Sequence, residues 1–126
     1  MRGLTHIDFS NNRAGDIAEV YATAALMAKG ATVFRNTGCD GKTDLCFKYK
    51  DQVYEIDVKI AFLTTCGNGS YAWKTQHASN VKPPVYPLIV VPKTFTDLSG
   101  WHCRWLLRGN QYGKPVCPPD LENLWD

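Results

Sequence analysis

The spacing of apolar residues differs from segment to segment along this chain, and the spacing in the first segment predicts a helix. After the potential capping side chains of Ser10, Asn11 and Asn12, apolar residues return every three or four positions as far as Gly30. This spacing predicts an amphipathic helix of about 16–18 residues that starts at a cap and stops at a glycine. The apolar side of this helix is expected to consist of Ile17, Val20, Tyr21, Ala24, Ala25 and Ala28.

A short β-like run and a β-hairpin are predicted next. The run covers residues 31–35, and a loop with two glycines covers residues 36–42. The first strand of the hairpin covers residues 43–49 and the second covers residues 53–62, with a turn at residues 50–52.

The second hairpin strand has one apolar and one charged face. Its alternating residues are Ile56, Val58 and Ile60 on one side, and Glu55, Asp57 and Lys59 on the other. A count outward from a turn centre near Asp51 puts Asp44 opposite residue 57 or 58. Asp44 is therefore expected within reach of Asp57 and Lys59. Simple exposure of the charged face to solvent would explain the alternation equally well.

The second half of the chain predicts further strands. Residues 86–92 are typical of a buried strand between prolines, and residues 101–107 are typical of another. Trp101 and Trp105 are spaced as on a helix, which conflicts with the strand prediction there. Residues 64–84 fit no clear pattern, and the proline-rich tail is expected to pack as irregular coil.

This order of elements predicts an α/β (α+β) fold. A mixed central β-sheet is expected, with the long N-terminal helix packed on one face. The length of 126 residues suits a single domain over residues 1–126.

The charge of the chain is small overall but unevenly distributed. Lys and Arg number 14 against 12 Asp and Glu, a net charge of +2. Residues 1–58 carry seven basic and eight acidic side chains, whereas residues 59–116 carry seven basic and one acidic. An acidic metal site beside a basic surface for a polyanion would give this distribution. Chance clustering on a solvated surface is the alternative.

Composition excludes several classes of protein. With 44% apolar and 21% charged residues, the chain is typical of a folded globular protein rather than a disordered one. No apolar run approaches the roughly 18 residues that span a bilayer, and the N-terminus lacks the apolar core of a signal peptide. We therefore expect no membrane partner and a cytoplasmic location, in the host cell if the protein is phage-encoded. The cysteines lack zinc-site spacing and are expected to be mostly buried free thiols: Cys39, Cys46, Cys66, Cys103 and Cys117.

The charged side chains named above can form a metal site. Glu19 lies mid-helix with small residues on its side, so it can reach the sheet and meet Asp44, Asp57 and Lys59. Carboxylates and a strand carbonyl are the hard oxygen ligands that suit Mg²⁺ or Mn²⁺. A neighbouring lysine can orient water and stabilise negative charge on a phosphate. Each residue also has an ordinary explanation. Asp44 could cap a turn, Glu19 could be an exposed helix glutamate, and Asp57 and Lys59 could form a surface ion pair.

These residues resemble the motifs of the PD-(D/E)XK nuclease superfamily. The matching motifs, in order, are Gly15-x-x-x-Glu19, Thr43-Asp44-Leu45 and Asp57-Val58-Lys59. Residues 12–61 are most similar to small nucleases of the Holliday-junction-resolvase and group I intron homing branches. The resemblance implies a restriction-endonuclease-like core.

The resemblance also implies roles for individual residues. Asp44, Asp57 and the carbonyl group of Val58 would hold the metal, Glu19 would bind the metal or its water, and Lys59 would act on the attacking water. Two residues depart from the usual pattern, because Thr43 replaces a proline and Asp57 replaces the commoner glutamate. Glu55, two residues earlier on the same face, either replaces Asp57 as a ligand or supplements it.

The resulting hypothesis is a Mg²⁺-dependent DNA endonuclease, either phage-like or homing-like, or a junction resolvase. Cleavage by water would leave 5′-phosphate and 3′-hydroxyl ends, and a homodimer would engage both strands of duplex or branched DNA. The candidate DNA contacts are Arg13, Lys74 and His77. The alternatives are a non-catalytic nucleic-acid-binding module on a nuclease fold, and a small structural or interaction protein.

Overall fold

Among the residues that the structure describes, the secondary structure consists of one long helix, eight strands and a short C-terminal 3-10 helix. The structure, a computed structural model, describes residues 11–35, 45–65, 71–75, 81, 83–93, 97–108 and 113–126. The elements are α1 (Asn11–Ala28), β1 (Thr32–Arg35), β2 (Leu45–Tyr49), β3 (Gln52–Ile60), β4 (Phe62–Thr65), β5 (Tyr71–Lys74), β6 (Val85–Val91), β7 (His102–Leu107), β8 (Pro115–Val116) and η2 (Pro119–Leu121).

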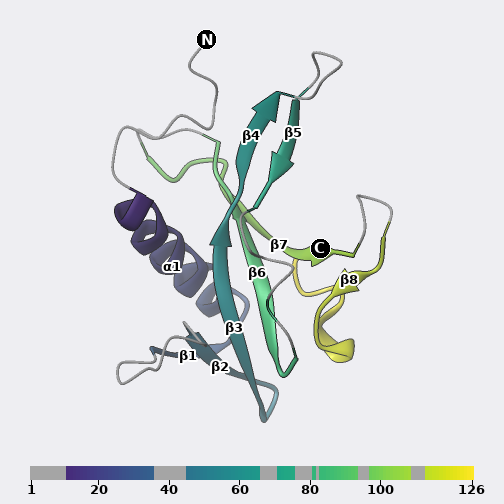
Figure 1. Ribbon diagram of the computed structural model, residues 1–126. Coiled ribbons are helices and arrows are strands. Elements are labelled where there is room, and N and C mark those ends of the chain that lie inside the picture. The colour runs from purple at the N-terminus through teal and green to yellow at the C-terminus, as the bar shows by residue number, and fades with distance from the viewer. Residues whose placement is uncertain are drawn as a thin grey trace.

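Six of the strands form one mixed sheet with the order β1-β2-β3-β6-β7-β8. The central pair, β3 and β6, runs parallel, whereas the other neighbours are antiparallel. Figure 1 shows β3 and β6 side by side in the middle, with α1 along the sheet. The strands β4 and β5 form a separate two-stranded sheet, seen in the upper part of Figure 1. The predicted fold class, a mixed sheet with a long helix packed on it, is confirmed.

A two-residue turn sets the register of the β2–β3 hairpin. Tyr49 pairs with Gln52, and the two residues between them, Lys50 and Asp51, have φ values of 49° and 66°. Two left-handed residues in succession are typical of the type I′ turn, whose twist matches that of the adjoining strands. The predicted hairpin and its turn are confirmed, but the second strand is shorter than predicted, since β3 ends at Ile60 and β4 begins after Ala61.

The buried face of α1 differs from the predicted face. The buried residues are Ala14, Ala18, Ala22 and Leu26. Val20 was predicted to face the core, but its side chain is 57% exposed. Ile17, Tyr21 and Ala25, also predicted, are partly buried against the core, so the buried face overlaps the predicted one but is rotated toward Ala18 and Ala22. Apolar residues occur on several sides of α1, so periodicity alone did not select a face. A stripe of alanines lets the helix lie close to the sheet.

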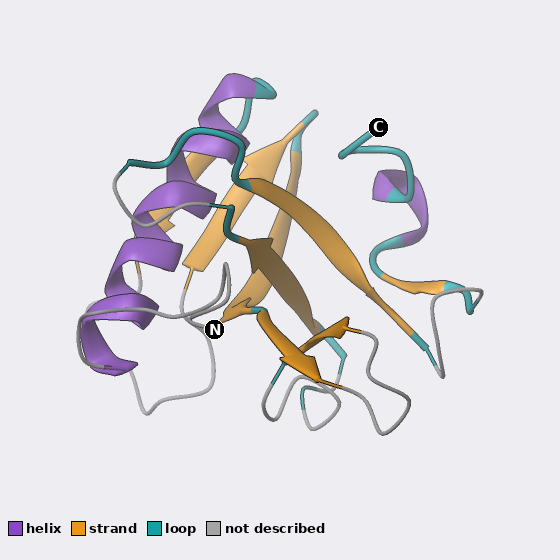
Figure 2. Cartoon of the chain, turned by 90° about the horizontal axis from the view of Figure 1, so that it is seen from above, coloured by secondary structure: helices purple, strands orange, loops and turns teal. Residues whose placement is uncertain are grey.

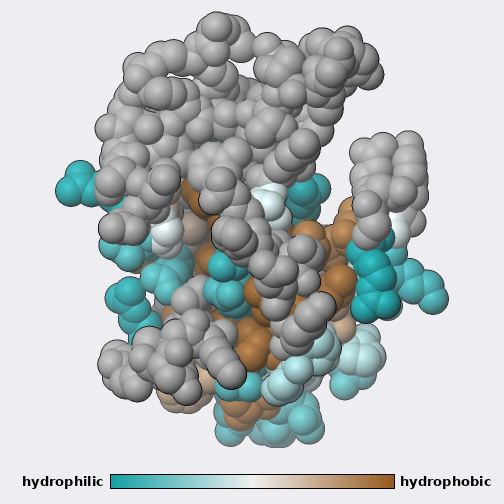
Figure 3. All heavy atoms as spheres, viewed as in Figure 1, coloured by the Kyte–Doolittle hydropathy of each residue, from teal (hydrophilic) through white to brown (hydrophobic). Residues whose placement is uncertain are grey.

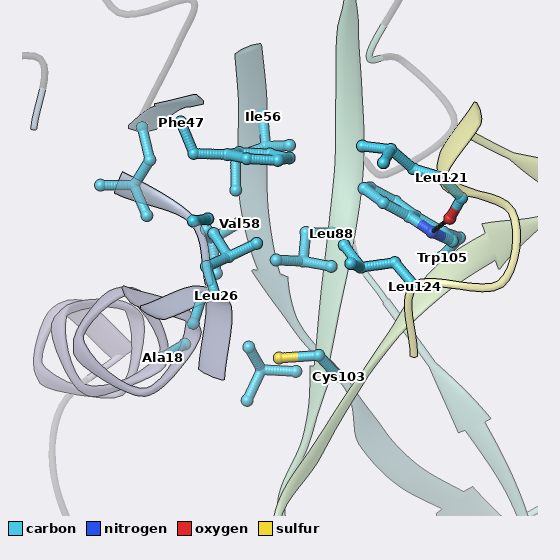
Figure 4. Packing of buried hydrophobic residues seen from close by; sticks show 14 of the residues in the cluster. Ala18, Leu26, Phe47, Ile56, Val58, Leu88, Cys103, Trp105, Leu121 and Leu124 are labelled. Atoms are coloured by element: carbon cyan, nitrogen blue, oxygen red, sulfur yellow. Dashed lines mark hydrogen bonds between the residues drawn. The ribbon is translucent and has the colours of Figure 1, made fainter. Parts of the chain in front are cut away.

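The core lies between α1, one face of the sheet and the C-terminal segment (Figure 4). The labelled strand residues Phe47, Ile56, Val58 and Leu88 point into it from β2, β3 and β6. In Figure 2 the strands lie between α1 and the C-terminal segment. Figure 3 shows apolar residues in the middle of the described part of one side of the molecule, bordered by hydrophilic residues.

The C-terminal tail is more ordered than predicted. Instead of irregular coil, it contains β8 and η2, and Leu121 and Leu124 belong to the core. The indole Nε1 of Trp105 donates a hydrogen bond of 2.9 Å to the carbonyl oxygen of Leu121. This bond fixes the tail on β7, because a buried indole N–H needs an acceptor.

Residues 101–107 form a strand, as predicted, despite their helix-like spacing. Trp101, Cys103 and Trp105 are buried, whereas His102 between them is exposed. This alternation is the period of two that a strand requires. The Tyr21 hydroxyl donates a hydrogen bond to the carbonyl oxygen of Trp101, which ties α1 to the start of β7.

The cysteines in the described ranges are free thiols, but only Cys103 is buried. Burial raises the pKa of Cys103 to about 12. Cys46 and Cys117 are half-buried, and Cys39 and Cys66 lie outside the described residues. Within the described ranges, no helix combines the length and the hydrophobicity needed to cross a bilayer.

The corrected helix face makes a prediction about two neighbouring residues. Leu26→Ala should lower the free energy of unfolding by about 2–5 kcal/mol, because it leaves a cavity in the core. Met27→Ala, at a position that is 60% exposed, should change it by less than about 0.5 kcal/mol. Urea unfolding followed by circular dichroism measures both changes. Equal losses would contradict the observed orientation of α1.

Candidate active site

The two faces of β3 have different chemistry. Ile56 and Val58 are buried in the core that α1 covers, whereas Glu55, Asp57 and Lys59 alternate with them and are half-buried. Because successive side chains of a strand point to opposite faces, the three charged residues lie on the side of the sheet away from α1. The alternation predicted from the sequence is therefore confirmed.

Asp57 and Lys59 form an ion pair on this charged face. The Nζ atom of Lys59 lies 3.3 Å from Oδ2 of Asp57. Their side chains are only 27% and 19% exposed, for Lys59 and Asp57 respectively. Reduced contact with water strengthens electrostatic interactions compared with a pair on an open surface.

Buried residues of β6 flank this ion pair. Asp57 pairs with Pro87 and Lys59 pairs with Ile89 in the parallel register. Pro87 and Ile89 are almost fully buried. Residues directly opposite each other on paired strands share a face, so the ion pair borders an apolar strip.

The β2–β3 register bears on the position predicted for Asp44. Leu45 pairs with Ile56 and Cys46 pairs with Glu55, as a count outward from the turn requires. Asp44, the residue before Leu45, lies outside the described residues, so its position opposite Asp57 stays a prediction. Cys46 on β2 pairs with Glu55. The pKa of the Cys46 thiol is raised first by burial and second by the negative charge of Glu55.

Glu19 lies on the other side of the sheet, between α1 and β1. Its Oε2 atom is 3.6 Å from Nη2 of Arg35, and the Glu19 side chain is 20% exposed. Arg35 pairs with Leu45, which pairs with Ile56, so the three residues form one row across the sheet. The Glu19–Arg35 ion pair therefore belongs to the helix side of the sheet, whereas Asp57 lies on the opposite side.

The glycine that precedes Glu19 by one turn has no packing role in the described structure. A Cβ atom built on Gly15 would meet nothing within 4 Å, and Gly15 is exposed. The small residue that does lie against the core next to Glu19 is Ala22, which is fully buried. Of the small residues expected to let Glu19 approach the sheet, Ala22 therefore packs closely against the core and Gly15 does not.

The described residues contain only part of the predicted metal site. Among them, no group of three or more His, Cys, Asp or Glu side chains is placed to hold a metal ion. The predicted set includes Asp44, which is not among them, so the set as a whole stays a prediction. Arg13 is exposed near the start of α1. The Lys74 side chain and His77, the other predicted DNA contacts, lie outside the described residues.

The sequence interpretation did not assign a role to Arg104, which the sheet brings to the charged face. Lys59 pairs with Ile89, and Ile89 pairs with Arg104 on β7. Partial burial lowers the pKa of the Arg104 guanidinium. The sequence signal for the face of Arg104 was the alternation of Trp101, Cys103 and Trp105 with polar residues. The spacing of Trp101 and Trp105, which also fits a helix, obscured this signal.

Comparison with known proteins identifies a structural neighbour. No protein-family model matches this chain, and no curated protein sequence matches it. Among solved structures, the chain is similar to a bacterial homing endonuclease, I-Ssp6803I, with a TM-score of 0.52 and 19% sequence identity. The match covers 85% of this chain and 66% of that chain, slightly less than two thirds of the neighbour's length. The similarity supports the nuclease-like fold predicted from the sequence.

The position of Arg104 on the charged face can be measured through His102, its neighbour on β7. Desolvation, followed by the charge of Arg104, lowers the pKa of His102 below its ordinary value of 6.5. An NMR titration should therefore give a midpoint below 6.5, and Arg104→Gln should raise it. Lys29→Gln, which removes an exposed charge beyond the end of α1, should leave it unchanged. A His102 midpoint insensitive to Arg104→Gln would contradict this arrangement.

Proposed function

We propose that this chain is a Mg²⁺-dependent DNA endonuclease of the PD-(D/E)XK type. The observation that carries the proposal is the half-buried ion pair of Asp57 and Lys59 on the charged face of β3. A carboxylate and an ammonium group two residues apart on one strand have the order and spacing of the D-x-K motif. The fold, shared with a bacterial homing endonuclease, supports the same function.

The environment of the ion pair favours a functional role over a simple surface contact. An ordinary surface pair between lysine and aspartate contributes about 0–1 kcal/mol and stays fully hydrated. Here Asp57 is 19% exposed and borders buried residues of β6. Partial removal of these charges from water costs free energy. A catalytic role would explain why charged residues occupy this position despite that cost.

The donor chemistry of the site suits a hard divalent cation. In this proposal the carboxylates of Asp44 and Asp57 and the carbonyl oxygen of Val58 hold Mg²⁺ or Mn²⁺, and Glu19 binds the metal or its water. All of these ligands are oxygen atoms, as Mg²⁺ prefers. Such an ion, when bound, would polarise the scissile phosphate and lower the pKa of water.

The protein side chains supply position and charge for the reaction. Lys59, with its ammonium group 3.3 Å from Asp57, orients the attacking water and stabilises the negative charge that develops on the phosphate. Asp57 holds Lys59 in place through the ion pair. Hydrolysis by in-line attack leaves 5′-phosphate and 3′-hydroxyl ends.

The proposed substrate is duplex or branched DNA, cut by a homodimer. Two copies of the site are needed to cut both strands of a duplex, and a two-fold dimer is the simplest way to supply them. A single domain over residues 1–126 and a cytoplasmic location complete the proposal. Arg13, Lys74 and His77 are proposed as further DNA contacts.

A cleavage assay tests the function. The protein should convert supercoiled plasmid or a four-way junction to cut product in Mg²⁺, and EDTA should stop the reaction. Asp57→Asn and Lys59→Ala should each lower the cleavage rate by about 10²-fold or more, the size of effect seen when a transition-state contact is lost. Gel analysis of time courses measures the rates.

Two variants control for changes of charge alone. Lys29→Ala and Glu122→Gln change exposed side chains away from β3 and should cut at the wild-type rate. Equal cutting by the wild type, Asp57→Asn and Lys59→Ala would contradict the site. Metal-independent DNA binding without any cleavage would instead identify a non-catalytic binding module.

A metal-binding measurement tests the proposed ligands without relying on activity. Calorimetric titration with Mn²⁺ should show binding to the wild type, and Asp44→Asn or Asp57→Asn should weaken it by at least about tenfold, because each variant removes a charged oxygen ligand. Lys59→Ala should retain binding, since it removes a cation. Unchanged Mn²⁺ affinity in both aspartate variants would rule out the proposed ligands.

A further inference from the structure

Two cationic side chains lie in one row across the charged face of the sheet. Lys59 on β3 pairs with Ile89 on β6, which pairs with Arg104 on β7. Because directly opposed residues share a face, both cations lie on the side away from α1. Two strand spacings separate their backbones, a distance of about 10 Å.

An apolar strip lies between the two cations. Ile89 is 1% exposed and packs with Ala61 and Val91, against which Leu106 also packs. This second, smaller cluster is distinct from the core under α1. Long cationic side chains commonly lay their methylene stems over such a strip while the charged ends remain near water.

The two cations differ in how their charge is balanced. Lys59 is paired with Asp57 at 3.3 Å. Arg104 is half-buried, and no carboxylate within the described residues forms an ion pair with it. The charge of Arg104 acts on His102, also basic, whose pKa is lowered by desolvation and then by Arg104. Partial burial of a guanidinium costs free energy that a counter-charge offsets, so an anionic ligand at this position would be stabilising.

We infer that Arg104 binds a backbone phosphate of the nucleic acid, a few nucleotides at most from the phosphate that faces Lys59. A guanidinium group matches the geometry of phosphate oxygens and can make two parallel hydrogen bonds to them. With a rise of about 3.4 Å per nucleotide, a separation of about 10 Å puts the two phosphates within roughly three nucleotides on one strand. This inference rests on the proposed function for the class of ligand.

The assignment makes Arg104 a binding residue of the phosphodiester chain rather than a reader of bases. Contacts to phosphates position the nucleic acid and carry no direct sequence information. The charged face would then have two parts, reacting groups on β3 and a phosphate contact on β7. The apolar strip on β6 would separate them.

The test is the salt dependence of DNA binding in EDTA, where no cleavage occurs. Fluorescence anisotropy with a labelled duplex gives the affinity of the wild type and of Arg104→Gln over a range of NaCl concentrations. Loss of one phosphate contact should make the plot of log affinity against log salt shallower by about 0.9, which is about an eightfold loss at 0.1 M salt. Arg104→Lys, which keeps the charge, should retain most of the slope.

The control variant is Lys29→Gln, which removes the same charge from an exposed site beyond the end of α1. It should bind with the wild-type slope. A second duplex of unrelated sequence should show the same loss with Arg104→Gln, because backbone contacts are independent of sequence. Circular dichroism verifies that Arg104→Gln is folded, and Arg104→Met, which keeps an apolar stem, replaces it otherwise.

The outcomes separate this inference from the proposed function. A wild-type slope in Arg104→Gln, with cleavage still abolished by Asp57→Asn, would overturn the phosphate site and leave the endonuclease intact. A loss confined to one DNA sequence would also overturn it, in favour of a base contact. A shallower slope in a protein that never cleaves would support the phosphate site and overturn the endonuclease.

Discussion

The parallel pairing of β3 with β6 is the constraint on which the rest of the structure depends. It places Val58 beside Leu88 in the core and Lys59 beside Ile89 on the opposite face. A parallel pair needs a long crossover, and here the chain between β3 and β6 contains the separate β4–β5 hairpin. The antiparallel neighbours, β2 and β7, then add to a central pair whose two faces are already distinct.

The separation of faces also organises the charges. Glu19 and Arg35 form their pair on the helix side, and Asp57 and Lys59 form theirs on the opposite side. On β3, Asp57 follows Ile56, which pairs with Leu45 on β2. The sheet therefore separates the two ion pairs.

The features that sequence predicted well are those fixed by nearby residues. The β2–β3 hairpin and the position of its turn could be predicted from local sequence, because the register follows from the two residues Lys50 and Asp51. The face of α1 did not follow, because alanines and larger apolar residues occur all round it and only the sheet decides which stripe is buried. Arg104 was missed for a similar reason. Its row with Lys59 depends on two successive pairings, β3 with β6 and β6 with β7, which together join residues 45 positions apart in sequence.

The alternation along β3 has a consequence for how its gene can change. One face of this strand supplies core packing and the other supplies the proposed chemistry. The insertion or deletion of a single residue within the strand therefore changes which side chains point to each face. Deletion of one codon between Gln52 and Ile60 would turn the residues beyond it by half a period and exchange the faces. Carboxylates would enter the core while isoleucine and valine would face solvent. Insertions and deletions are therefore far less tolerable in this strand than substitutions. A single deletion would remove both the core packing and the proposed chemistry.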